Sequence, residues 1–158
     1  MDKQLAKQMF MQGYSCSQAV ACAFADECGM TVDQLKKAAI AFGGGFVHQH
    51  SLCGALTGGA LVAGIVKGGT EPNSKMHFAQ TFEWVVDDFV KKHGSLFCSD
   101  LAEDKAKLFE KADLSVATEQ EYKDRPCLSL VMSVVDMVAD YISNNSIKKF
   151  LNRLFIFI

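Results

Sequence analysis

Apolar residues recur along most of this chain at the three- and four-residue spacing that marks one face of an α-helix. Clear examples of this spacing cover residues 16–24, 78–90 and 127–142. The strict alternation of apolar and polar residues that indicates half-buried strands is scarce. The pattern therefore predicts an all-α protein, built as a single-domain helical bundle of about five to seven helices.

Several helix boundaries can be placed from local signals. Thr31 and Gln34 form a capping-box pattern, which predicts a helix over residues 31–42 that stops at three consecutive glycines. A helix is also expected over residues 74–93, because the glycine that follows suits the left-handed position at a helix end. Residues 96–110 are expected to be helical as well.

The segment that follows Cys53 is rich in glycine and alanine. Each glycine inside a helix costs up to about 1 kcal/mol relative to alanine. A helix that keeps several glycines is therefore expected to lie very close to a neighbouring backbone. We expect it to be the central helix of the bundle, buried on most sides.

Residues 1–145 are expected to form the helical domain, and residues 146–158 a hydrophobic amphipathic tail. One face of that tail is apolar, with Ile147, Phe150, Leu151, Leu154, Phe155 and Ile158. Such a segment usually packs on its own domain, but it can also join two copies into a homo-oligomer or lie on a membrane surface. We do not expect contact with a membrane.

Charge and hydropathy exclude several classes of protein. The formal net charge of −2 provides no basic field that would attract nucleic acid. The longest apolar run, residues 53–66, is shorter than the roughly 20 residues needed to cross a bilayer. No secretory signal is recognised, so the expected location is the cytoplasm. There, cysteines are more often reduced, metal-bound or redox-active than joined in structural disulfides.

Four of the six cysteines stand where helices are expected to begin: Cys16, Cys53, Cys98 and Cys127. Each follows a residue suited to a helix start, namely Ser15, Ser51, Ser95 and Pro126. A helix N-terminus carries partial positive charge and free N–H groups, and both stabilise a thiolate. We therefore expect lowered thiol pKa values here, with Cys16 and Cys53 more reactive than the two cysteines outside this set.

Helix starts that are far apart in sequence can meet at one end of a bundle. No Cys-x-x-Cys pair is present, so any site must be assembled in this way from separate helices. Four converging thiolates could hold a zinc ion or an iron–sulfur cluster, whereas converging pairs could cycle between dithiol and disulfide. The cysteines could also be inert, because cysteine packs as a small apolar residue in helical cores.

Two histidines, His48 and His50, shortly precede Cys53 in the glycine-rich loop. They could act as additional metal ligands, because imidazole binds zinc, iron and copper. Alternatively, one of them could be a base beside Cys53 that lowers the pKa of its thiol.

These motifs resemble the family of redox-active proteins named for its C-GCAxxG-C-C signature. The resemblance covers roughly residues 8–142 and is carried by Gly13-Tyr14-Ser15-Cys16, Cys53-Gly54-Ala55-Leu56-Thr57-Gly58, Gly94-Ser95-Leu96-Phe97-Cys98 and Pro126-Cys127. It implies a small helical protein in which those four cysteines are redox-active. Similar sequence also occurs joined to multi-haem electron-transfer proteins, so haem joins zinc and an iron–sulfur cluster among the candidate cofactors. Both histidines, Cys22 and Cys28 lie outside the signature.

The leading hypothesis is a thiol-based redox protein, a candidate oxidoreductase, whose four signature cysteines exchange electrons with a redox partner as dithiol and disulfide. The alternative is a non-enzymatic electron-transfer or metal-binding protein. In that case the same four thiolates hold a metal ion or an iron–sulfur cluster.

Overall fold

The computed structural model describes residues 1–102 and 126–143. These residues form eight α-helices and one 3₁₀ helix and contain no β-strand, so the prediction of an all-α fold is confirmed. In chain order the elements are α1 (Lys3–Met11), α2 (Cys16–Cys22), α3 (Ala25–Cys28), α4 (Val32–Ala39), η1 (Ile40–Phe42), α5 (Gly54–Lys67), α6 (Ser74–His93), α7 (Cys98–Ala102) and α9 (Cys127–Ile142).

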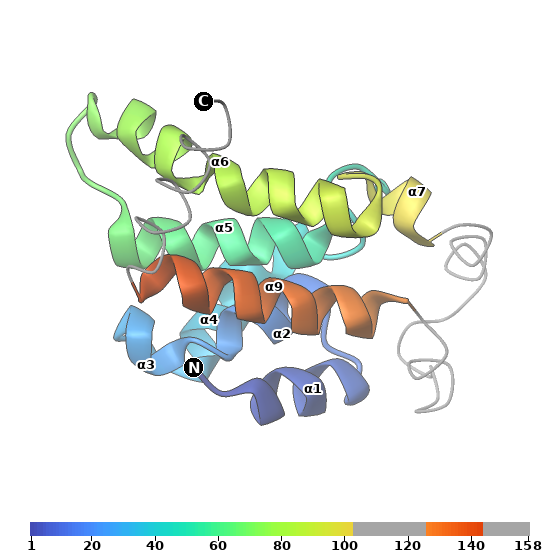
Figure 1. Cartoon of the computed structure of the whole chain (residues 1–158). Helices are drawn as coiled ribbons and strands as arrows, with labels where there is room; N and C mark the ends of the chain where they lie inside the picture. The colour runs from blue at the N-terminus through green and yellow to red at the C-terminus, as the bar shows by residue number, and fades with distance from the viewer. Residues whose placement is uncertain (103–125, 144–158) are drawn as a thin grey trace.

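Helix α5 is the glycine- and alanine-rich helix, and it lies in the middle of the bundle. It packs against α2, α6 and α9, and Figure 1 shows it running between α6 and α9. Ala55, Val62 and Ala63 on this helix are fully buried. The prediction that this helix lies at the centre of the bundle is therefore confirmed.

The glycines of α5 let neighbouring helices approach its backbone. A Cβ atom built on Gly58 would lie 2.7 Å from the Ser17 carbonyl oxygen of α2. One built on Gly59 would lie 2.7 Å from a methyl carbon of Val134 in α9. Neither position has room for a side chain, which explains why this helix accepts residues of low helix propensity.

Helix α2 is short, yet it packs against α1, α4, α5 and α9. Its start is fixed by the predicted pattern: the Gln18 N–H donates to Ser15 Oγ at 3.3 Å, and the Ser15 N–H donates to Gln18 Oε1 at 3.0 Å. The Ser17 hydroxyl donates to the Ala39 carbonyl oxygen at 2.8 Å. Buried hydrogen bonds of this kind fix both the position and the rotation of α2.

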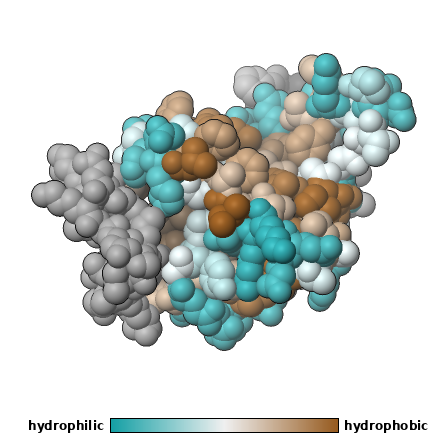
Figure 2. Space-filling model, turned by 180° about the vertical axis from the view of Figure 1, so that it is seen from behind, coloured by the Kyte–Doolittle hydropathy of each residue, from teal (hydrophilic) through white to brown (hydrophobic). Residues whose placement is uncertain are grey.

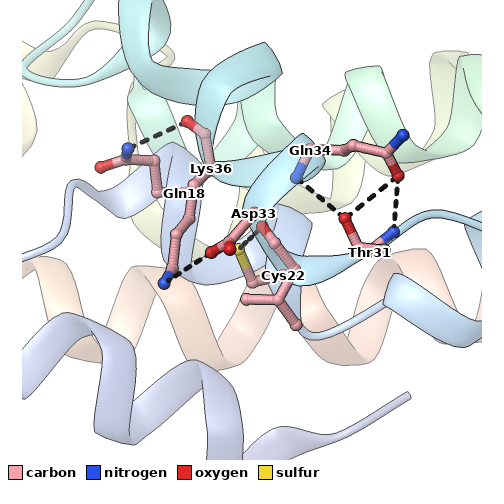
Figure 3. Close-up of polar contacts among 7 residues, drawn as sticks. Gln18, Cys22, Thr31, Asp33, Gln34 and Lys36 are labelled. Carbon is pink, nitrogen blue, oxygen red and sulfur yellow. Dashed lines mark hydrogen bonds and ion pairs between the residues drawn. The ribbon is translucent and has the colours of Figure 1, made fainter.

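Helix α4 receives a second polar link from α2. The Gln18 side-chain amide donates to the Lys36 carbonyl oxygen at 3.0 Å, as Figure 3 shows. The same view shows the capping box of Thr31 and Gln34 that opens α4, as the sequence predicted. These contacts hold the N-terminal half of the chain against the helix that begins with Cys16.

Helix α9 is anchored along α6. Tyr141 makes an edge-to-face contact with Phe82, with ring centroids 5.2 Å apart, and its hydroxyl lies 3.0 Å from Thr81 Oγ1. Nearer the start of α9, the His93 Nε2 atom of α6 hydrogen-bonds the buried Ser133 hydroxyl at 2.9 Å. The two contacts fix α9 along its length and so determine where Cys127 lies.

The predicted helix over residues 74–93 has the bounds that the structure gives α6. Of the helix expected over residues 96–110, the structure describes α7, and the remainder lies outside the described residues. The tail of residues 146–158 also lies outside them. Within the described part of the chain, no helix combines the length and hydropathy needed to span a membrane.

Candidate functional site

The four signature cysteines lie at helix starts. Cys16, Cys98 and Cys127 are the first residues of α2, α7 and α9, and Cys53 is the N-cap of α5. In Figure 1 helices α5 and α9 begin at the right-hand end of the bundle, beside α7. The fold therefore directs residues from distant parts of the sequence toward one end of the molecule.

Cys127 is the common neighbour within this cysteine cluster. Its thiol is hydrogen-bonded to that of Cys16. It also lies close enough to Cys53 and Cys98 to act electrostatically on both thiols. All four cysteines carry free thiols. The structure thus brings the four residues singled out in the sequence into one cluster.

A cavity of about 180 Å³ lies against this cluster. Its titratable lining residues are Tyr14, Cys16, His48, His50, Cys98 and Cys127. Cys53 is not part of the lining, and only 3% of its surface is exposed. Three of the four clustered cysteines therefore line a space that a small molecule can enter, and the fourth is buried.

The thiols of the cluster are stabilised in their neutral form. The hydrogen bond with Cys127 and then burial raise the pKa of Cys16 well above its ordinary value. Burial raises the pKa of Cys98 to about 12. Burial also raises the pKa of Cys53, although the N–H groups of Leu56 and Ala55 in the first turn of α5 act in the opposite direction. The prediction of lowered pKa values is therefore wrong for these three thiols, because the hydrogen bond with Cys127 at Cys16, and burial at Cys53 and Cys98, outweigh the effect of the helix N-termini.

The start of α7 shows a further reason. The Cys98 N–H donates to the Ser51 carbonyl oxygen at 2.6 Å, and the Ser99 N–H donates to the His50 carbonyl oxygen at 3.1 Å. Two amides that could have stabilised a thiolate at this helix start are thus already bonded to the preceding loop. The result is a half-buried thiol without the usual N-terminal stabilisation.

Two of the predicted helix caps are wrong. Ser51 does not cap α5, because its hydroxyl donates to the Gly45 carbonyl oxygen at 2.8 Å and Cys53 occupies the N-cap position. Ser95 lies too early to cap α7 directly; instead its hydroxyl accepts the Phe97 N–H at 3.0 Å. In both cases the serine stabilises the loop that precedes the helix.

The loop between η1 and α5 has an unusual backbone. Gly44 and Gly45 adopt positive φ, as the glycine run indicated, but four further residues also do: Phe46, Val47, His48 and His50. Positive φ costs about 1–3 kcal/mol at a non-glycine residue. It is held here by hydrogen bonds, such as that from the Val47 N–H to the Ala41 carbonyl oxygen at 2.8 Å. The sequence did not indicate this left-handed continuation.

This loop carries both histidines to the cavity. His50 Nδ1 lies 4.0 Å from Cys98 Sγ. The expected imidazole contact therefore falls on Cys98 rather than on Cys53. The cause is tertiary: Leu52 and Phe97 pair in an isolated antiparallel bridge, which lays the loop beside the start of α7.

The other two cysteines lie apart from this cluster. The Cys22 thiol donates to the Val32 carbonyl oxygen at 3.6 Å (Figure 3), and burial raises its pKa to about 11. Cys28 is half-buried near the end of α3. Over residues 1–102 and 126–143, no group of three or more His, Cys, Asp or Glu side chains is arranged to hold a metal ion.

Part of the surface near the cavity is apolar. Several large apolar side chains are exposed between residues 40 and 52 and at the residue before α7. They are Ile40, Phe46, Val47, Leu52 and Phe97. Figure 2 shows apolar residues in groups across one face of the molecule, between hydrophilic ones. Ile40 also lines the cavity, so this apolar surface reaches the cysteine cluster.

The fold and this cluster define a class of protein: a small helical bundle in which four free thiols from separate helix starts meet beside a cavity. A family model described as "Putative redox-active protein (C_GCAxxG_C_C)" matches residues 14–141, so the chain belongs to this family. The searches of curated proteins and of solved structures gave no significant match.

Proposed function

We propose that this protein is a dithiol–disulfide redox protein in which Cys16 and Cys127 form the reversible disulfide. The observation that carries the proposal is the hydrogen bond between their thiols. Two cysteines can be joined without backbone movement only where their Cα atoms lie within about 7 Å of each other. Of the thiols in the cluster, these two are the pair joined by a hydrogen bond.

The reaction is a two-electron oxidation. The two thiols lose their protons and two electrons, and an S–S bond forms between Cys16 and Cys127. An external disulfide is the acceptor, and it is reduced to two thiols. The reverse reaction restores both cysteine thiols.

The surroundings of this pair favour a strongly reducing couple. Strong thiol oxidants have a reduced form that is stabilised as thiolate. Here, the contact between the thiols and their burial keep Cys16 protonated, and Cys127 is only 7% exposed. We therefore infer a low reduction potential, in keeping with our proposal that the protein acts in the cytoplasm.

The experiment is a thiol count across a graded series of reduced and oxidised dithiothreitol, with metal analysis of anaerobically prepared protein. We expect the loss of two thiols per molecule and their recovery on reduction. Cys127→Ser abolishes this loss, whereas the matched control Cys22→Ser keeps it, because the Cys22 thiol bonds the backbone of α4 instead. Stoichiometric zinc or iron that protects all four clustered thiols from labelling would favour the metal-binding alternative and overturn the proposal.

A further inference from the structure

We propose that Cys98 is the thiol that first reacts with an external disulfide and that His50 is the base that accepts its proton. This inference rests on the proposed function and names the residues through which an oxidant reaches the buried pair.

Access distinguishes Cys98 from the other thiols of the cluster. Cys98 is half-buried, while Cys53 and Cys127 are 3% and 7% exposed. Its neighbours in sequence, Phe97 and Ser99, are exposed, so α7 lies at the surface of the molecule. Cys16 is also half-buried, but its thiol is hydrogen-bonded to Cys127. Cys98 is therefore the thiol that a molecule arriving from solvent can reach without breaking a contact within the thiol pair.

Cys98 needs a base before it can react, because only the thiolate is an effective nucleophile. The amides at the start of α7 are bonded to loop carbonyl groups, and burial raises the pKa of the thiol. His50 Nδ1 lies 4.0 Å from Cys98 Sγ, and both residues line the same cavity. The imidazole is thus placed to accept the proton as the sulfur attacks.

Among the described residues that line the cavity, no other group suits this role as well. The remaining titratable ones are Tyr14, Cys16, His48 and Cys127, and no carboxylate, lysine or arginine joins them there. On α7 itself, Asp100 accepts hydrogen bonds from the hydroxyls of Ser95 and Ser99. Histidine is the side chain whose ordinary pKa lies between pH 5 and 8. Of the two histidines, His50 is the one with a contact to Cys98 sulfur.

The strained loop explains why His50 stays in place. His50 itself has a φ of 54°, and its N–H donates to the Gly44 carbonyl oxygen at 3.0 Å. Its own carbonyl oxygen accepts the Ser99 N–H of α7 at 3.1 Å. Hydrogen bonds to its own loop and to α7 therefore hold the backbone of His50 beside the start of α7.

The reaction then passes along the cluster by thiol–disulfide exchange. The Cys98 proton moves to His50, and its sulfur attacks one sulfur of the external disulfide RSSR. This gives a mixed disulfide on Cys98, and the leaving thiolate takes the proton from His50 and departs as RSH. The Cys127 thiol then attacks Cys98 Sγ, and the second RSH leaves with the Cys127 proton. Finally Cys16 attacks Cys127 Sγ and its proton passes to the Cys98 sulfur that leaves, which forms the Cys16–Cys127 disulfide and returns Cys98 to its thiol form.

The size and polarity of the cavity indicate the class of substrate. A volume of about 180 Å³ suits a small, uncharged disulfide. The described lining contains no lysine or arginine that would bind an anion and no carboxylate that would bind a cation. Bis(2-hydroxyethyl) disulfide is a probe of this class.

The first test measures the alkylation rate of Cys98 in the reduced, full-length protein between pH 5 and 9, by peptide mapping with iodoacetamide. We expect an inflection within this range in the wild type that disappears in His50→Gln, whose rate at neutral pH falls roughly a hundredfold. His48→Gln, the matched control, keeps the wild-type profile, and Cys28 provides an internal reference in every sample. A wild-type profile without the inflection would overturn the role of His50, whatever the stability of the variants.

The second test traps the mixed disulfide. Cys127→Ser cannot carry the reaction past Cys98, so the probe should accumulate on Cys98, whereas Cys22→Ser should release it. An adduct that appears first on Cys16 would contradict the assignment of Cys98. Neither readout requires that Cys16 and Cys127 form the final disulfide, so failure of this inference is distinguishable from failure of the proposed function.

Discussion

The thiol of Cys16 is hydrogen-bonded to the thiol of Cys127, although one residue begins α2 and the other begins α9. These two helices also pack against each other. Helix α2 is held from one side by buried polar contacts, such as that of Ser17, and α9 is held from the other by α6. The contact between the two thiols is therefore a property of the packed bundle.

The raised pKa of Cys98 predicts that the protein loses stability in alkaline solution. Above about pH 9 the unfolded state loses the Cys98 proton while the folded state keeps it. The unfolded state then binds fewer protons, so the free energy of unfolding falls as the pH rises from about 9 to about 12. Across this range, the free energy of unfolding should fall less in Cys98→Ser than in the wild type. The control Cys28→Ser should keep more of the wild-type fall than Cys98→Ser does. Denaturant unfolding at each pH measures these changes. Parallel curves for wild type and Cys98→Ser would contradict the burial of this thiol.

Two glycines of α5 provide a matched test of the close helix packing. Gly58→Ala places a Cβ atom 2.7 Å from the Ser17 carbonyl oxygen, and the overpacking should destabilise the protein by about 1–3 kcal/mol. Gly64→Ala meets nothing within 4 Å, so it should stabilise by up to about 1 kcal/mol through helix propensity. Thermal or denaturant unfolding measures both. Equal effects of the two substitutions would show that α2 and α5 do not approach as closely as described.

The order of thiol reactivity in the folded, reduced protein should follow exposure rather than position in a helix. Cys28 is half-buried and outside the cluster, whereas Cys53 is 3% exposed and Cys22 is fully buried. We expect iodoacetamide to label Cys28 well before Cys53 and Cys22 at neutral pH, which reverses the order that helix N-termini alone would give for Cys53. Peptide mapping over time measures the three rates. Cys53 as the fastest of the three would show that its thiol is open to solvent.

Much of the fold was predictable because its signals are local. The capping boxes at Ser15 and Thr31 fix helix starts within a few residues, and the apolar spacing of residues 78–90 identifies α6. The glycines of α5 indicated close packing because each one costs helix stability that only a near neighbour can offset. The positions of the four signature cysteines at helix starts were also predictable, because they too rest on local sequence signals.

What the sequence could not predict depends on tertiary contacts. The pKa values of Cys16 and Cys98 are set mainly by burial and by each thiol's neighbours, and these arise only when separate helices meet. The amides at the start of α7 are occupied by carbonyl groups of His50 and Ser51, a pairing of segments far apart in sequence. The left-handed backbone at Val47 contradicts local preference, so no local pattern could indicate it.

The central claim is tested most directly by mapping the disulfide in the oxidised protein. Free thiols are blocked under denaturing conditions, the chain is digested without reduction, and the linked peptides are identified by mass spectrometry. The account predicts one dominant linkage, between Cys16 and Cys127, with Cys22 and Cys28 carrying the label of free thiols. Oxidised protein in which Cys16 and Cys127 both carry that label, or in which either is joined to Cys22 or Cys28, would contradict it.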